Sequence, residues 1–426
     1  YVQTSTDTVS RFTETKSAAE LADDFTDLLD EFTAWLKLRS DIIKQRNASI
    51  ATLKFPFPQY RTGQHEFAAA VYKAIYSRAR LFVQAPTGTG KTISTLFPTI
   101  KAMGSGLIQR AFYLTAKQST RRVAEQAIAL MADVGLRAKS ITLTATFADE
   151  PDDPSQNPYM LGYYDRLKPA LHDLLEYEDQ LTRSVIESYA RKHTLDPFEF
   201  SLDASLFCDV VICDYNYLFN PLVFLQRFFS EADDSQFFLV DEAHNLVSRA
   251  RDMYTASLTN QDFINLKQAL APFKGTALTK VRRTMTRIVT TMNTLADQLL
   301  NGQSLIFQAA PLDDLAQVLT RFTETVHDWL AEPPTPALQP AVELVLPVFF
   351  LANQYLRIGD FYDDTFKTEI AKEHDTIMIK MLCLDPSHFV DDAFKKGRGA
   401  VLFSATLSPM PYFQKLLGGA EHSLAY

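Results

Sequence analysis

The sequence has few cysteines, little glycine and no long apolar run, and each shortage excludes a class of protein. Three cysteines in 426 residues are too few for the disulfide framework of a secreted scaffold. Cys208 and Cys213 form the closest pair, but without neighbouring histidines they are a poor zinc site, and small buried side chains are the simpler interpretation. No stretch approaches about 18 consecutive apolar residues, so no membrane span is predicted. No basic and then apolar opening marks a secretory signal.

The charge is acidic overall. The net charge of −9, from 42 basic and 51 acidic residues, argues against coating of nucleic acid by bulk electrostatics but leaves room for a local basic groove. Apolar residues at 46% and charged residues at 22% indicate an ordinary globular chain. The 14 glycines are about half the usual share, which indicates many helices. Because the chain does not begin with Met, we expect it to be a piece of a longer protein.

Short apolar, β-prone runs alternate with helical stretches. The runs lie at residues 80–84, 111–114, 210–213, 237–240 and 400–403. Continuous apolar strands separated by helices predict an α/β fold, with a parallel sheet between helices. Upstream, a capping-box pattern at Ser17 and Glu20 begins an amphipathic helix predicted over 17–38, and a second helix is predicted over 64–78.

Two insertions interrupt this alternation, at residues 140–201 and 249–396. The first contains an acidic, proline-rich loop at 149–158, and the second is expected to be mostly helical, with a proline-rich loop at 332–340. Apolar residues of the second insertion recur in steps of three and four and predict a bundle seam: Leu278, Val281, Met285, Ile288, Met292, Leu295 and Leu299. A seam inside the molecule is favoured over an intermolecular coiled coil. The remaining divisions are residues 1–16 as the tail of an upstream domain, 17–53 as a helical linker, and 54–139, 202–248 and 397–419 as the α/β domain.

The clearest chemical signal is the segment Ala85-Pro-Thr-Gly-Thr-Gly-Lys-Thr92, which follows one strand and precedes a helix. It matches the P-loop pattern, with Ala in place of the first glycine. Glycines allow backbone N–H groups to wrap a phosphate at a helix start, Lys91 is placed for the β- and γ-phosphates, and the Thr92 hydroxyl suits Mg²⁺. The predicted phosphate-binding residues are Thr87, Gly88, Thr89, Gly90, Lys91 and Thr92.

Two further motifs follow apolar strands. Asp241-Glu-Ala-His244 places an acidic residue at the end of a buried strand, which is costly unless the carboxylate binds a cation. Asp241 is therefore a predicted Mg²⁺ ligand, and Glu242 is suited to activating the water that attacks the γ-phosphate. By itself Ser404-Ala-Thr406 is uninformative. It becomes informative as the third motif along the chain, after the P-loop and Asp241-Glu-Ala-His244.

These motifs resemble those of superfamily 2 helicases, and the details resemble the XPD/DinG family of DNA helicases. The resemblance is carried by Tyr60-Arg-x-Gly-Gln64, Leu114-Thr-Ala-Lys117, the stretch Val210–Phe219, the DEAH box at 241–244 and Leu402-Phe-Ser-Ala-Thr-Leu407. It extends from Phe55 to Gly419. It implies a RecA-like P-loop domain with an iron–sulfur-domain-like first insertion and an arch-like second insertion. It also implies ATP and Mg²⁺ as ligands, movement on single-stranded DNA from 5′ to 3′, work in repair or replication, and a bacterial, cytoplasmic protein without a membrane partner.

The resemblance further implies roles for individual residues. Gln64, with Arg61, would bind the adenine end of the nucleotide, and His244 with Ser404 and Thr406 would couple hydrolysis to DNA movement. Lys117 and its neighbours would line the DNA path. Thr115, Lys117, Arg121 and Arg122 suit phosphate contacts physically, although solvated surface explains the two arginines equally well. Tyr215 and Tyr217 could stack on bases, but packing beneath the arch is an equal alternative.

The sequence departs from the family in its first insertion. Residues 140–207 contain no cysteine, whereas the family places four iron–sulfur ligands there, and Asn157 and Asp196 occupy positions where ligands are expected. Cys208 and Cys213 cannot replace four thiolates, so no iron–sulfur cluster is expected. The family also continues into a second RecA-like domain with a catalytic arginine, so this chain alone is expected to bind nucleotide and hydrolyse it poorly. A nucleotide-gated DNA-binding module without unwinding activity is the alternative function. A nuclease needs a carboxylate cluster with a catalytic lysine, and none is found outside the DEAH box, so any nuclease would lie outside this chain.

Overall fold

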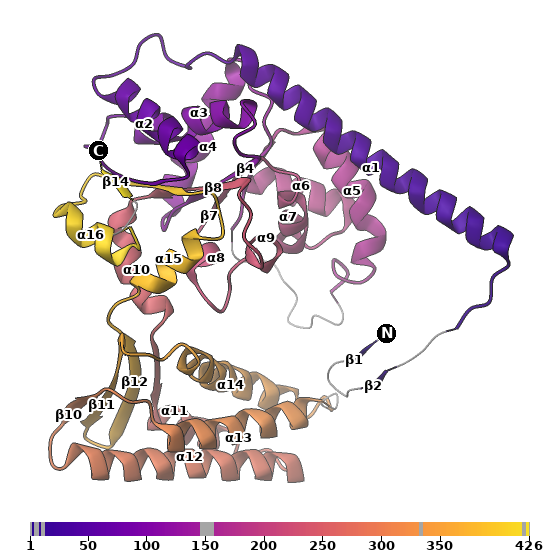
Figure 1. Cartoon of the computed structure of the whole chain (residues 1–426). Coiled ribbons are helices and arrows are strands. Elements are labelled where there is room, and N and C mark those ends of the chain that lie inside the picture. The colour runs from indigo at the N-terminus through magenta and orange to yellow at the C-terminus, as the bar shows by residue number, and fades with distance from the viewer. Residues whose placement is uncertain are drawn as a thin grey trace. The chain divides into compact units, whose positions relative to one another are not determined.

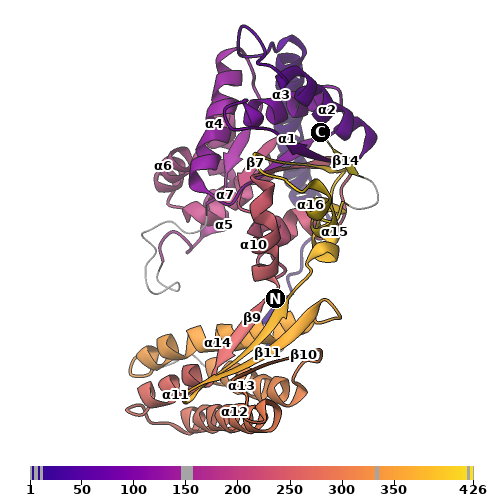
Figure 2. The same ribbon diagram turned by 90° about the vertical axis from the view of Figure 1, so that its left-hand side faces the viewer.

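The structure is a computed structural model that describes residues 2–3, 8–9, 13–144, 157–331, 335–419 and 423–425. It divides into two compact units. The sheet unit comprises Ala18–Ser248 and Ser387–Tyr426, and the helical unit comprises Tyr1–Ser17 and Arg249–Pro386. Figures 1 and 2 show the elements of both units. The loop predicted at 149–158 lies mostly outside the described residues, as does the start of the loop predicted at 332–340.

Eight strands of the described chain form the sheet of the sheet unit, and every pairing between them is parallel. Their spatial order is β14-β3-β13-β8-β4-β7-β5-β6. The bounds are β3 Arg80–Gln84, β4 Arg110–Leu114, β5 Ser140–Thr142, β6 Gln180–Leu181, β7 Val210–Cys213, β8 Gln236–Asp241, β13 Ala400–Ser404 and β14 Ser423–Ala425. The predicted α/β fold is confirmed, and all five predicted strands are present to within a residue at each end.

Helices cover both faces of this sheet (Figures 1 and 2). On one face, Leu81 and Val83 of β3 and Leu239 of β8 share a buried cluster with side chains of α2, α3 and α4. On the other face, Phe112 and Phe238 pack among the rings of α9 and α15. The helices are α1 Ala18–Thr52, α2 Gln64–Ser77, α3 Lys91–Gly104, α4 Gln118–Asp133, α5 Tyr163–Tyr177, α6 Arg183–His193, α7 Pro197–Ser205, α8 Asn216–Phe219, α9 Gln226–Phe229, α15 Ser387–Phe394 and α16 Met410–Leu416, with α10 Leu246–Met253 at the boundary of the units.

The first insertion is not separate from the sheet. Strands β5 and β6, which the sequence did not predict, extend the sheet beyond β7. Runs of three and two residues are too short to give a strand signal. Helices α5, α6 and α7 follow in the same unit, so the expected boundary at residue 140 corresponds to no domain boundary in the structure.

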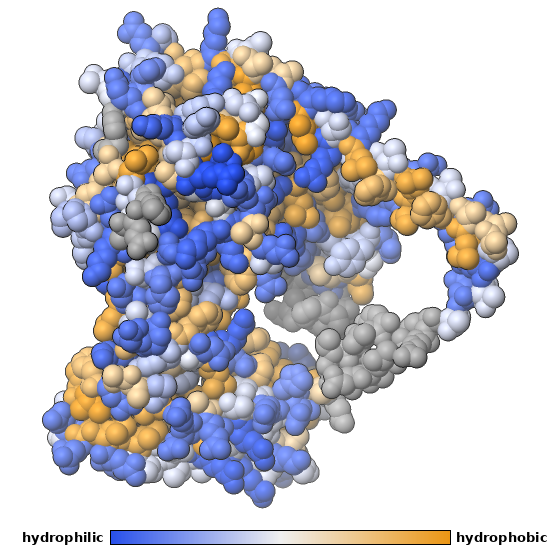
Figure 3. All heavy atoms as spheres, viewed as in Figure 1, coloured by the Kyte–Doolittle hydropathy of each residue, from blue (hydrophilic) through white to orange (hydrophobic). Residues whose placement is uncertain are grey.

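Helix α1 is much longer than the predicted amphipathic segment. Its last turns pack into the core through Ile50, and Arg46 pairs with Asp209, with 2.5 Å between the guanidinium nitrogen and the carboxylate oxygen. Its first turns instead expose an apolar ridge, visible as orange spheres along α1 in Figure 3. The ridge consists of Leu21, Phe25, Leu28, Leu29, Phe32 and Leu36.

The helical unit combines helices with an antiparallel sheet. Its sheet has the order β10-β11-β12-β9, and β1 pairs with β2 in a separate hairpin. The strands are β1 Val2–Gln3, β2 Thr8–Val9, β9 Ala256–Thr259, β10 Leu305–Gln308, β11 Phe366–Glu373 and β12 Thr376–Cys383, and the helices are α11 Asn260–Ala269, α12 Thr276–Leu300, α13 Asp313–Leu330 and α14 Gln339–Gly359. The predicted seam lies on α12, where all its members but the half-buried Leu299 are buried. The unpredicted sheet shows that "mostly helical" was an incomplete description.

Helix α14 is long and apolar enough to cross a membrane by length and composition alone. A core helix passes the same test. The side chains of Val345, Ala352 and Ile358 are buried, and α14 packs against α11, α13 and β9. The helix thus has protein neighbours within its own unit.

Candidate functional site

The P-loop lies between the end of β3 and the start of α3. Gly88 and Gly90 both have left-handed backbone conformations, with φ of 82° and 76°. A Cβ atom at Gly90 would lie 2.5 Å from Nε2 of Gln64, so a side chain there would displace the end of Gln64 as well as strain a left-handed backbone. The Thr89 hydroxyl donates to the Pro86 carbonyl at 2.8 Å and ties the loop to itself. The sequence therefore builds the turn that the motif predicts.

Lys91 begins α3 and folds back over the loop. Its Nζ donates to the carbonyl oxygens of Ala85 at 3.3 Å and Pro86 at 3.5 Å. The first turn of α3 carries no acidic residue. Unpaired N–H groups of a helix start and an ammonium beside them favour an anion, so the loop is suited to a phosphate group.

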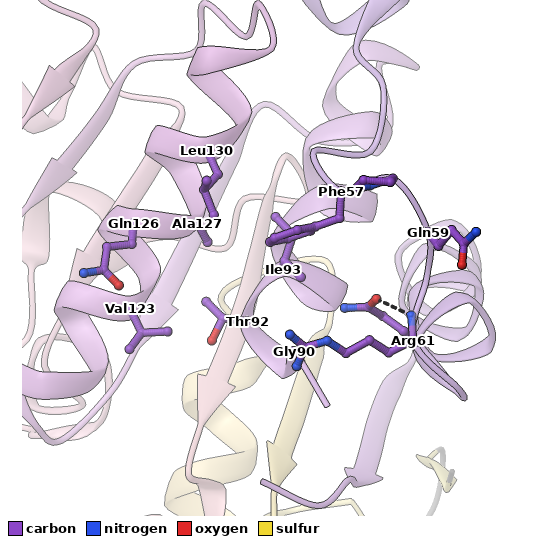
Figure 4. A pocket seen from close by; sticks show the side chains of 12 residues that line it. Phe57, Gln59, Arg61, Gly90, Thr92, Ile93, Val123, Gln126, Ala127 and Leu130 are labelled. Atoms are coloured by element: carbon purple, nitrogen blue, oxygen red, sulfur yellow. Dashed lines mark hydrogen bonds between the residues drawn. The ribbon is translucent and has the colours of Figure 1, made fainter. Parts of the chain in front are cut away.

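A pocket of about 460 Å³ adjoins the loop. Gln64 is buried at its wall, and its Oε1 accepts a hydrogen bond of 2.9 Å from the Arg61 amide, drawn as a dashed line in Figure 4. The Arg61 guanidinium donates to the Gly88 carbonyl and so joins this wall to the P-loop. The lining residues are Phe57, Pro58, Gln59, Arg61, Gln64, Gly90, Thr92, Ile93, Val123, Gln126, Ala127 and Leu130.

Several lining residues were not predicted from the sequence. Val123, Gln126, Ala127 and Leu130 come from α4, which faces Ile93 and Thr92 across the pocket in Figure 4. These residues reach the pocket because α4 packs against α3, and no sequence motif predicts that contact. The turn-rich stretch at 55–60 was visible in the sequence, and it supplies the opposite rim.

Asp241 ends β8 within reach of the P-loop threonine. The Tyr113 hydroxyl, from β4, donates to Oδ2 of Asp241 at 2.7 Å and lies 3.4 Å from the Thr92 hydroxyl. Burial raises the pKa of Asp241 to about 6, and the neighbouring Glu242 charge adds to the rise, while the hydrogen bond from Tyr113 and the nearby Lys91 oppose it. Burial also raises the pKa of Tyr113, so its phenol remains the donor. A hydroxyl and a carboxylate meeting at one point form a donor set suited to Mg²⁺.

The carboxylate of Glu242 connects the DEAH box to the Ser404-Ala-Thr406 motif. Glu242 has a left-handed conformation, with φ of 50°, which is unusual for a residue with a side chain. Its amide donates to Oδ1 of Asp241 at 2.8 Å. Ser404 donates to Oε2 of Glu242 at 3.0 Å, and its hydroxyl oxygen lies 2.6 Å from Nδ1 of His244. Glu242, His244 and Ser404 therefore form one hydrogen-bonded cluster.

The parallel register brings these motifs to one edge. Strand β13 lies between β3 and β8, with Ser404 opposite Gln84 and Phe403 opposite Asp241. The Ala85 amide donates to the Ser404 carbonyl at 3.0 Å. Thr406 is exposed, and its amide lies 3.3 Å from the Ser404 hydroxyl oxygen. Thr87 is also exposed, at the tip of the P-loop.

Two of the predicted DNA contacts, Tyr215 and Thr115, are corrected by the structure. Tyr215 is fully buried, and its hydroxyl donates to the Asp241 carbonyl, so its ring presents no face to a base. Thr115 is also buried, and its hydroxyl pairs with that of Thr120. Arg121 pairs with Asp214 at 3.1 Å, and Lys117 is exposed at the start of α4. Lys117 has the surface position that a phosphate contact requires, and so does the exposed Arg122.

Asn157 and Asp196 have structural contacts of their own. The Asp196 side chain caps α7 by accepting from the Glu199 amide at 2.8 Å. Asn157 accepts from the Tyr159 amide at 2.9 Å, and the Tyr159 carbonyl in turn accepts from the Asp196 amide at 3.2 Å. Both side chains are buried. The described part of the chain contains no cluster of three or more His, Cys, Asp or Glu residues that could hold a metal ion.

Two family models match parts of this chain. A family model described as DEAD/DEAH box helicase matches residues 65–162, and the model DEAD_2 matches residues 163–263. The matched residues include the P-loop and the DEAH box, so this part of the chain is similar to DEAD/DEAH box helicases.

Two curated relatives of this chain are both XPD-type helicase subunits. The chain is 21% identical to the general transcription and DNA repair factor IIH helicase subunit XPD of Schizosaccharomyces pombe, over 85% of this chain and 60% of that protein. It is 23% identical to the corresponding XPD/RAD3 subunit of Saccharomyces cerevisiae, over 48% of this chain and 31% of that protein. The chain is thus similar to XPD-type helicases of superfamily 2, and it spans about 60% of the length of the first of these relatives.

Solved structures agree on the fold. The structure titled "XPD_Helicase" matches with a TM-score of 0.55 and 15% identity, covering 87% of this chain and 62% of that one. The structure titled "Truncated XPD" matches with a TM-score of 0.53 and 15% identity, covering 84% of this chain and 98% of that one. The expected RecA-like fold is thereby confirmed.

Proposed function

We propose that this protein is an ATP-driven helicase motor that moves on single-stranded DNA, from 5′ to 3′, in the repair or replication of DNA in a bacterial cytoplasm. The observation that carries the proposal is the hydrogen-bonded cluster of Glu242, His244 and Ser404 beside the P-loop. A carboxylate that only bound a metal would need no such connection to a second strand end. A carboxylate whose activity must respond to the movement of another strand would need this connection.

The residues have distinct parts in hydrolysis. The P-loop amides and Lys91 hold the phosphates, and the pocket at Arg61 and Gln64 takes the base. Thr92 and Asp241 would hold Mg²⁺, which neutralises charge on the β- and γ-phosphates. Glu242 orients the attacking water and accepts its proton. Ser404 and His244 set the position of the Glu242 carboxylate, so a shift of β13 changes the rate of hydrolysis.

The test is ATP hydrolysis by the full-length protein, with and without single-stranded DNA, with Lys91→Ala as the control. Strong stimulation by DNA that disappears in the variant supports a DNA-driven motor. Binding of nucleotide and DNA without stimulation would contradict it and leave the nucleotide-gated binding module. We also propose that residues 1–426 alone bind nucleotide and hydrolyse it slowly, which the same assay on the chain measures.

We further propose that the first insertion folds without an iron–sulfur cluster. The helix cap at Asp196 and the turn held by Asn157 support this, because each side chain already accepts a backbone hydrogen bond. Burial raises the pKa of the Cys208 and Cys213 thiols far above the range of metal-binding thiolates. Iron analysis of anaerobically purified protein tests the proposal, and about four iron atoms per chain would contradict it.

A further inference from the structure

The helical unit contains a long stretch without carboxylates. No Asp or Glu occurs between Asp262 and Asp297. The same stretch contains Lys267, Lys274, Lys280, Arg282, Arg283 and Arg287. In a chain with a net charge of −9, this concentrates positive charge on α12 and the segment before it. A local basic excess in an acidic protein is typical of a surface that receives an anionic partner.

Three of these cations, Lys280, Arg283 and Arg287, line a groove between α12 and α13 together with Arg321 of α13. The groove consists of two adjoining hollows, of about 570 Å³ and 500 Å³, which share Thr284, Arg287, Arg321 and Glu324. Lys280 and Arg283 line the first hollow from α12, and Trp329 lines it from α13. We call it the α12–α13 groove. It lies wholly within the helical unit.

The groove cations are not occupied by structural contacts. Lys280, Arg283, Arg287 and Arg321 are all exposed, and within the described residues none of them has an ion-pair partner. Arg282 differs, because its guanidinium donates to the carbonyls of Leu270 and Phe273 and so holds the turn before α12. Two carboxylates, those of Glu324 and Asp328, also line the groove. Four cations against two carboxylates leave a positive excess.

The spacing of the cations fits a chain of phosphates. Lys280, Arg283 and Arg287 follow one another at three and four residues and therefore share a helix face over about 10.5 Å. Phosphates of a strand with stacked bases are about 3.4 Å apart along the axis and lie further apart when the strand is extended, so this length faces at most about three phosphates. Arginine guanidinium groups bind phosphate oxygens in pairs.

Trp329 adds an aromatic surface to this row. Its side chain is half-buried, so it combines a fixed position with an accessible part. Unpaired bases stack on such rings, whereas the bases of a duplex are already stacked on one another. An acidic peptide would satisfy the arginines but gains nothing comparable from an aromatic ring.

We propose that the α12–α13 groove binds a single-stranded nucleic acid segment, with Arg283, Arg287 and Arg321 on its phosphates and Trp329 against a base. The proposal rests on the proposed function for the kind of partner. It goes beyond that function by assigning a contact surface remote in sequence from all the ATPase motifs.

The first test measures binding of a single-stranded oligonucleotide to the 426-residue chain as salt is varied. The double variant Arg283→Gln/Arg287→Gln is compared with Lys267→Gln/Arg357→Gln, which removes the same charge from α11 and α14. Loss of two phosphate contacts reduces the slope of log K against log salt by about 1.4, which weakens binding about 25-fold near 0.1 M salt. The control variant should retain the wild-type slope. Equal slopes for all three proteins would overturn the proposal.

The second test uses tryptophan emission. The chain has two tryptophans, so Trp35→Phe makes Trp329 the sole reporter. A stacking base should quench its emission, and an abasic oligonucleotide of equal length should quench it much less. Equal quenching by the two, or none, would overturn the assignment of Trp329.

The outcomes separate this proposal from the proposed function. Oligonucleotide binding that is independent of the groove arginines overturns the groove and leaves the motor intact. Failure of the wild-type chain to bind any oligonucleotide overturns both. Polyglutamate binding that needs Arg283 and Arg287, beside oligonucleotide binding that does not, overturns the groove in favour of an acidic protein partner.

Discussion

Replacing Asp241 by asparagine should stabilise the nucleotide-free protein at neutral pH while abolishing hydrolysis. The carboxyl group is 5% exposed, and its raised pKa of about 6 means that burial penalises the ionised form. The rise from an ordinary aspartate pKa to about 6 corresponds to about 3 kcal/mol. Below the pKa of the unfolded chain both states are protonated and this cost is absent. It grows as pH rises and reaches its full value above about pH 6.

The expected gain therefore depends on pH. The amide keeps one of two hydrogen bonds, from Tyr113 or from the Glu242 backbone, which subtracts about 1 kcal/mol at every pH. The remaining advantage should grow by about 1.5 kcal/mol between near pH 5 and near pH 8. Urea unfolding without Mg²⁺ measures it, followed by Trp35 emission in a Trp329→Phe background so that the signal comes from the sheet unit.

A matched control has the opposite sign. Asp209 is also 5% exposed, and burial raises its pKa as well, but its carboxylate forms an ion pair with the buried Arg46. Asp209→Asn leaves that arginine without a counter-charge and should destabilise the protein by about 3–5 kcal/mol. A stability advantage of Asp241→Asn that is the same at both pH values would refute the reasoning, as would destabilisation similar to that of Asp209→Asn.

Three further predictions concern the same site. Ser404→Ala removes a hydrogen bond to the Glu242 carboxylate and should lower DNA-stimulated turnover about 10- to 100-fold, with nucleotide affinity unchanged in equilibrium binding; an equal loss of affinity would contradict a positioning role. Gly90→Ala should weaken nucleotide binding at least about tenfold, whereas Gly106→Ala, at a similar φ but with open space around it, should cost stability alone, and calorimetric titration of both separates the two effects. Gln64→Ala should raise the KM for ATP about tenfold and reduce discrimination against GTP, while Gln268→Ala, on the exposed face of α11, should change neither; identical kinetics for the two variants would remove Gln64 from base recognition.

Motif segments could be predicted well from the sequence because their signals are local. Strands β3, β8 and β13 are continuous apolar runs, and the glycines of the P-loop dictate a turn. The connection of Thr92 to Asp241 through Tyr113 could not be foreseen. Tyr113 appears in the sequence as one more residue of an apolar strand, and its partner depends on the register between β4 and β8.

The sheet of the helical unit shows a signal that was present but overlooked. In β11 and β12, buried residues alternate with half-buried ones, and His374 and Asp375 form the turn between them. Charged residues such as Lys367 and Glu369 on the alternate face lowered the apparent β character of the run. The error at Tyr215 has a different cause. The sequence alone cannot distinguish a tyrosine whose ring stacks on a ligand from a tyrosine whose hydroxyl donates to the backbone carbonyl of Asp241.

The exposed ridge of α1 has a consequence for how the protein behaves in solution. The same turns carry Glu20, Asp23, Asp24, Asp27, Asp30 and Glu31, and no Lys or Arg lies between Ala18 and Lys37, although Lys168 pairs with Glu31. Repulsion between these carboxylates keeps the ridges of different molecules apart in dilute buffer. Near 0.15 M salt the screening length falls to about 8 Å, while the attraction between apolar faces persists. Colloidal stability should therefore decline as ionic strength rises, contrary to the behaviour of most proteins that bind polyanions.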